Sequence, residues 1–87
     1  MQVHAAIGAQ VPPSSQDLAL RIDIARATHR IGLLQTSLGL VKDANATLGR
    51  AVAEVDALLR EAPAESRLHA LAVESRNAHS AALQADG

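Results

Sequence analysis

The fold is decided by residues 20–62, which read LRIDIARATHRIGLLQTSLGLVKDANATLGRAVAEVDALLREA. Apolar residues recur there at alternating spacings of four and three, the a and d positions of a heptad repeat. This heptad seam consists of Leu20, Ile24, Ala27, Ile31, Leu34, Leu38, Val41, Asn45, Leu48, Val52, Val55, Leu59 and Ala62. Asn45 is its one polar member. A sustained period of 3.5 residues is typical of a coiled coil or a long bundle helix.

The seam predicts one long amphipathic helix over about residues 16–62. Ser14 and Asp17 have the layout of a capping box, so the helix should begin at Ser15 or Gln16. A break near residues 43–47 stays open, because several polar residues there could cap a new helix. The unbroken heptad phase favours a single helix.

The first half of this helix carries a second apolar stripe, which consists of Leu18, Ile22, Ala25, Leu33 and Leu40. A helix that is apolar over so much of its surface is expected to pack against two neighbours.

A shorter helix over about residues 64–85 is predicted after the seam. Pro63 ends the long helix, and Glu65 suits the first turn of the next one. The second helix should lie antiparallel along the second half of the long one. The sequence therefore predicts an all-α helical hairpin or bundle.

The chain is short and contains no aromatic residue and no cysteine among its 87 residues. We expect a single helical domain over residues 14–87, preceded by a flexible N-terminal arm over residues 1–13 that ends in two prolines. A chain of this length hides only about 60–65 % of the surface of its unfolded form. Its core is therefore thin, and we expect self-association or a protein partner to complete it.

Charge and hydropathy exclude several classes of function. Eight basic and nine acidic residues give a net charge of −1 without a block of like sign, so a nucleic-acid partner or an anionic membrane is not expected. No apolar run approaches the roughly 18 residues of a membrane span, and the N-terminus lacks signal-peptide features. A cytoplasmic location is the resulting expectation.

Among the side chains of this sequence, that of His29 is the best suited to a chemical role. It lies on the second apolar stripe, which predicts a half-buried histidine at a helix contact. The segment HRIGLLQTSLGL, His29–Leu40, also resembles the phosphoacceptor helix of histidine-phosphotransfer domains, whose pattern is close to H-x-[LI]-K-G-[SA]-x-x-x-[LV]-G. Besides His29, the matching residues are Ile31, Leu38 and Gly39.

This resemblance implies that His29 would accept a phosphoryl group. Two positions depart from the family pattern: Gly32 stands in place of its lysine and Leu33 in place of its glycine. Arg26 is the one cation on that face that could replace the lysine.

Asn45 has two interpretations: it fixes the register of a dimer, or it marks the end of a helix. A buried amide in an apolar seam fixes register and favours a parallel dimer when it pairs with its symmetry mate. The flanking e and g positions carry few opposed charges, so an antiparallel dimer is equally compatible with the pattern.

No metal, cofactor or catalytic site is predicted. Glu65 and His69 lie one helical turn apart, but the sequence places no third ligand beside them. No nucleophile motif or phosphate-binding loop is present, and we do not expect an enzyme.

Three functional hypotheses follow. The first is a non-enzymatic interaction or assembly module that forms a homo-oligomer through the heptad seam. The second is phosphotransfer on His29, and the third is a structural subunit of a larger assembly.

Overall fold

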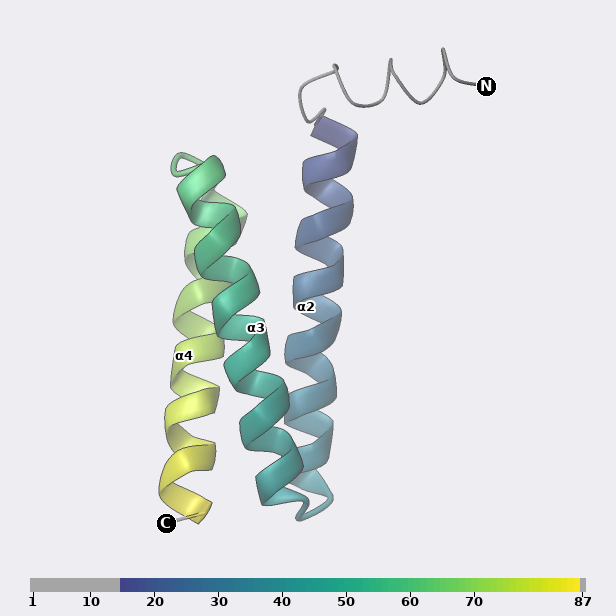
Figure 1. Cartoon of the computed structure of the whole chain (residues 1–87), viewed down its shortest axis with the longest axis vertical. Helices are drawn as coiled ribbons and strands as arrows, with labels where there is room; N and C mark the ends of the chain where they lie inside the picture. Colours follow the sequence, from purple (N-terminus) through teal and green to yellow (C-terminus); the bar gives the residue numbers. More distant parts are fainter. Residues whose placement is uncertain (1–14, 87) are drawn as a thin grey trace, which may run out of the picture.

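The computed structural model describes residues 15–86, and within that range the chain forms three helices and no strand. The helices are α2 (Ser15–Ser37), α3 (Val41–Glu61) and α4 (Ser66–Asp86). Consecutive helices are antiparallel, so that in Figure 1 α2 runs downward, α3 upward and α4 downward again. Helix α3 packs extensively against both neighbours, whereas α2 and α4 touch each other far less. The all-α prediction is confirmed; the arm predicted over residues 1–13 lies outside the described residues.

The long helix predicted over residues 16–62 is divided by a turn at residues 38–40, earlier than the possible break at residues 43–47. Gly39 adopts a positive φ of 79°. Its N–H donates to the carbonyl of Thr36 at 3.1 Å, and the N–H of Leu40 donates to that of Gln35 at 2.9 Å. These two bonds form a Schellman motif, which ends a helix where glycine takes the left-handed conformation. The fold is therefore a three-helix bundle and not a two-helix hairpin.

The second break lies where the sequence predicted it. The N–H of Ala62 donates to the carbonyl of Leu58 at 2.8 Å, and the N–H of Glu65 donates to that of Ala62 at 3.1 Å. Pro63 and Ala64 form the turn, and α4 then begins at Ser66. The predicted boundaries of 64–85 thus differ by one or two residues from the observed helix.

The core consists of aliphatic side chains between the three helices. Its larger cluster contains Ile22, Ala25, Val55, Leu58, Leu68, Leu71 and Ala72. A smaller cluster consists of Ala44, Leu48 and Ala82. Of the second apolar stripe, Ile22 and Ala25 are buried, while Leu33 and Leu40, the N-cap residue of α3, remain exposed. Most of the core therefore comes from α3 and α4.

Gly32 lets α2 approach α3 closely. It is buried, and a Cβ at this position would overlap Cδ2 of Leu48 and lie 2.5 Å from its Cγ. Any larger residue would therefore have to displace a fully buried leucine.

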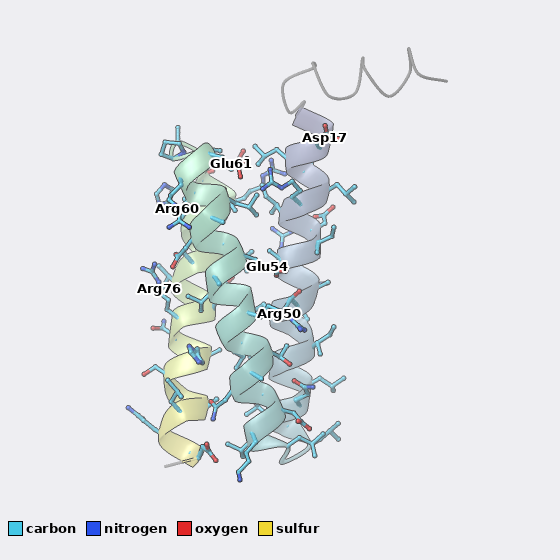
Figure 2. The ribbon with its side chains drawn as sticks, viewed as in Figure 1. Asp17, Arg50, Glu54, Arg60, Glu61 and Arg76 are labelled. Atoms are coloured by element: carbon cyan, nitrogen blue, oxygen red, sulfur yellow. The ribbon has the colours of Figure 1, made fainter. Side chains whose placement is uncertain are left out.

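Two ion pairs join neighbouring helices at the surface. Arg21 on α2 donates two hydrogen bonds of 2.7 Å to the Glu61 carboxylate at the end of α3, and Arg76 on α4 donates one of 2.6 Å to Asp56 on α3 (Figure 2). These pairs lie near the surface, where water and salt screen the charges, so they contribute little to stability.

Candidate interaction surface

One face of α2 is apolar and lies open to solvent. We call it the α2 stripe and define it by six residues of the heptad seam, five on α2 and the sixth in the turn that follows it: Leu20, Ile24, Ala27, Ile31, Leu34 and Leu38. The exposed fractions of its large side chains are 60 % for Leu20, 52 % for Ile24, 50 % for Ile31, 61 % for Leu34 and 65 % for Leu38. Ala27 is exposed as well. Single exposed leucines are ordinary, but a contiguous apolar row of this kind is a candidate interaction surface.

The bundle cannot cover this stripe because α2 turns its opposite face inward. The inward face carries Ile22, Ala25, His29 and Gly32, all of them buried. At 100° per residue, these positions lie on the far side of the helix from the stripe. Consequently α2 is apolar on two opposite faces, and only one of them is used within the chain.

The second half of the heptad seam is used inside the bundle. Leu48 and Val55 are fully buried in the two core clusters, and Val41, Asn45, Val52 and Leu59 are partly buried. Leu48 and Val55, predicted as interface residues, are therefore core residues of a single chain. The packing of α4 along α3 explains why this half of the seam is covered while the α2 half is not.

Asn45 lies on α3, away from the α2 stripe. Its side chain is partly buried, and its Oδ1 has no hydrogen-bond partner among the described residues. A symmetric pairing of two such amides across an α2–α2 contact is thus not compatible with its position. The interpretation of Asn45 as a helix end is also wrong, since α3 begins four residues earlier.

His29 is buried at the contact between α2 and α4. Its Nδ1 lies 3.3 Å from Oγ of Ser75, which is fully buried on α4. The guanidinium of Arg26 lies 3.5 Å from the carboxylate of Asp23, its neighbour on the same helix. The imidazole therefore provides a hydrogen-bond partner for a buried hydroxyl. His29 lies at a helix contact, as predicted, but it is buried and not half-buried.

Ser75 is not among the residues that the sequence predicts to be important, although it is fully buried beside His29. The signal was present, because Ser75 follows Leu68 by seven residues and Leu71 by four, and thus continues the buried face of α4. A polar residue on such a face needs a partner, and His29 supplies one.

Glu65 and His69 do not converge on a common point. The Glu65 carboxylate pairs with Arg67 at 3.0 Å, while Nε2 of His69 lies 2.6 Å from the carbonyl oxygen of Pro63. Within residues 15–86, no group of three side chains has the arrangement of a metal site.

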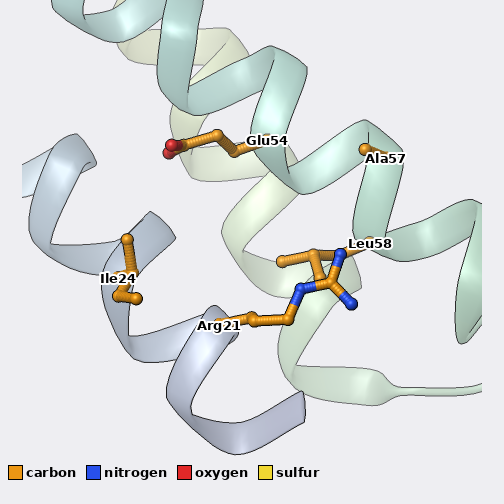
Figure 3. Close-up of a pocket in the computed structure, with 5 residues that line it drawn as sticks. All are labelled: Arg21, Ile24, Glu54, Ala57 and Leu58. Atoms are coloured by element: carbon orange, nitrogen blue, oxygen red, sulfur yellow. The ribbon is translucent and has the colours of Figure 1, made fainter. Parts of the chain in front are cut away.

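A small cavity of about 220 Å³ lies beside the stripe, between α2 and α3. Figure 3 shows Arg21 and Ile24 on one side and Glu54, Ala57 and Leu58 on the other. One carboxylate oxygen of Glu54, Oε1, is buried without a hydrogen-bond partner among the described residues. The cavity is smaller than the roughly 300–1,000 Å³ of most ligand pockets, so the open stripe is the stronger candidate surface.

Comparison with models of protein families, with characterised proteins and with solved structures finds no significant match. None of the described helices has the length and apolar character needed to cross a membrane.

Proposed function

We propose that this protein is a non-enzymatic helical interaction module that self-associates through the α2 stripe. The observation that carries the proposal is the row of half-exposed leucines and isoleucines on the face of α2 that the bundle does not use. A heptad arrangement on that face suits knobs-into-holes packing against another helix of the same kind.

A second copy of the chain fits the stripe better than an unrelated helix because of the flanking charges. Asp23 and Arg30 lie one heptad apart at g positions beside the stripe, and both are exposed. In an antiparallel dimer, g positions face each other, so Asp23 of each copy would lie opposite Arg30 of the other. The dimer would therefore contain two such pairs. In a parallel dimer, these charges would face Thr28 and Gln35 instead. Charge complementarity therefore favours an antiparallel homodimer.

The expected affinity is moderate. Covering the exposed half of a leucine or isoleucine contributes about 1 kcal/mol. The five large stripe residues, present twice in a dimer, supply on the order of 10 kcal/mol toward an association cost of about 4–15 kcal/mol. We therefore expect the oligomeric state to depend on protein concentration.

Phosphotransfer on His29 has less support than self-association. The buried ring, its contact with Ser75 and the packing of Leu48 against Gly32 leave little room for a phosphoryl group or for the active site of a donor protein. Incubation with phosphorylated receiver domains is the test. We expect no transfer of label, and transfer to the wild type but not to His29→Gln would favour this second function.

The test of self-association compares two pairs of exposed apolar residues. We expect Ile24→Gln with Ile31→Gln to leave the far-ultraviolet circular dichroism unchanged and to reduce the mass measured by light scattering to that of a monomer. The matched control is Val73→Gln with Leu83→Gln, which removes two equally exposed apolar residues from α4. A control that loses the dimer to the same extent, or a wild type that is monomeric at millimolar concentration, would reject the proposal.

The orientation is tested by charge reversal. Arg30→Asp and Asp23→Arg should each weaken the dimer, because each places like charges opposite one another. The double reversal should restore it. Additive weakening in the double variant would indicate that these two residues do not meet.

A further inference from the structure

We propose that two copies of this chain can also exchange α2, by straightening the turn at Leu38–Leu40 so that α2 and α3 form one continuous helix. In the exchanged dimer, α2 of each copy packs into the bundle of the other. This inference goes beyond association through the α2 stripe, because it joins the copies through the core and does not require the stripe.

The turn depends on the backbone of a single residue. Gly39 holds the positive φ that ends α2, and a Cβ at this position would meet no atom within 4 Å. The N-cap residue of α3, Leu40, makes no side-chain cap hydrogen bond. The rest of the bundle thus does not brace the turn, and rotation of Gly39 into the helical region would let the hydrogen-bond ladder continue.

The sequence around the turn suits the interior of a helix. Leu34, Leu38, Val41 and Asn45 keep the spacing of four, three and four across it, and no proline intervenes. Leucine is a strong helix former, and both leucines of the turn are exposed in the closed bundle.

A straight helix would also place the inner faces of α2 and α3 on the same side. Leu58 follows Ile22 by 36 residues, which is ten full turns, and Thr47 follows His29 by 18 residues, which is five turns. All four residues are buried in the closed bundle. Two such helices laid antiparallel would re-form between copies the contacts that α2 and α3 make within one chain, as domain swapping requires.

The residue at position 39 should set the balance between the closed and exchanged forms. Alanine disfavours the left-handed conformation of the turn and favours the continuous helix. Together these two effects shift the equilibrium between the closed and exchanged forms about 30-fold toward the exchanged form for each hinge. Asparagine tolerates the left-handed conformation far better, so Gly39→Asn is the matched control for Gly39→Ala.

The experiment uses a pair of cysteines that the native chain lacks. Arg21→Cys and Glu61→Cys replace an exposed ion pair between α2 and α3, and a short bismaleimide then links them. A closed bundle gives links within one chain, and an exchanged dimer gives covalent dimers on a denaturing gel. All variants in this experiment also carry Ile24→Gln and Ile31→Gln. The yield of covalent dimer then does not depend on whether the stripes associate.

After refolding at millimolar concentration, we expect Gly39→Ala to give at least tenfold more covalent dimer than Gly39→Asn. We also expect the dimer from the unaltered hinge to increase with the concentration at which the chain is refolded. Links within one chain only, in a helical Gly39→Ala variant, would overturn the proposal. If that variant does not fold, links within one chain only at the unaltered hinge would overturn it equally.

Discussion

At the scale of single residues, two glycines in helices show how local packing decides what a position tolerates. Gly32 and Gly49 both lie inside helices, where alanine is favoured over glycine by up to about 1 kcal/mol. A Cβ at position 32 would overlap the fully buried Leu48. A Cβ at position 49 would lie 3.3 Å from Nε2 of His79, whose side chain is only partly buried and can move.

We therefore predict opposite effects of the same substitution. Gly32→Ala should lower the free energy of unfolding by about 1–2 kcal/mol, because the strain of overpacking against Leu48 exceeds the gain in helix propensity. Gly49→Ala should leave it unchanged or raise it by up to about 1 kcal/mol. Urea unfolding followed by circular dichroism measures both. Equal effects at the two sites would show that Leu48 does not restrict position 32.

Asn45 provides a second prediction at this scale. Because its Oδ1 is buried without a partner, Asn45→Val should raise the free energy of unfolding by about 1 kcal/mol. Asn45 does not lie on the α2 stripe, so the mass in solution should stay the same. Asn77→Val, at an exposed position on α4, is the control and should have little effect. A lower mass for Asn45→Val would place this residue in the interface after all.

At the scale of elements, the ion pair between the start of α2 and the end of α3 makes stability depend on pH. The hydrogen bonds from Arg21 lower the pKa of Glu61 below its ordinary value of 4.5. A carboxyl group whose pKa is lowered on folding stabilises the fold above the pKa of its unfolded form. That contribution is lost as the pH falls through the folded value.

Glu61→Gln should therefore reduce the loss of thermal stability between pH 6 and pH 3. Some loss should remain, since Arg67 lowers the pKa of Glu65 in the same way. Thermal melts recorded across this pH range test the prediction. Glu74→Gln, at an exposed position on α4, is the control. A pH profile of Glu61→Gln identical to that of the wild type would show that the Arg21–Glu61 pair does not form in solution.

The elements also show what the sequence can and cannot reveal. Pro63 marked the turn between α3 and α4 correctly, because proline cannot continue a helix. The sequence does not predict the turn at Gly39, because the heptad phase runs through it without a break. Local sequence does not separate Gly39 from Gly32: both are glycines one heptad apart, yet one ends a helix and the other lies inside it. The difference arises from tertiary contacts, since Leu48 packs against Gly32 only when α3 folds back along α2.

At the scale of the whole molecule, the heptad seam serves two purposes. Its α3 half is fully or partly buried within the chain, by α4 and, at Leu48, also by α2. Its α2 half stays open on the outer face of the bundle. The seam residues were identified from their spacing alone, but spacing cannot say which partner covers each half. Which partner covers each half depends on the turn at residues 38–40, because this turn divides the seam between two helices.

If the α2 stripe of one copy packs against the α2 stripe of another, a single cysteine in the stripe should link the two copies. Ala27 lies in the middle of the stripe, and Ala53 is equally small and exposed on α3. With a short bismaleimide at micromolar protein concentration, we predict that Ala27→Cys forms a covalent dimer many times faster than Ala53→Cys. Equal rates for the two variants, or no covalent dimer from Ala27→Cys, would contradict self-association through the α2 stripe.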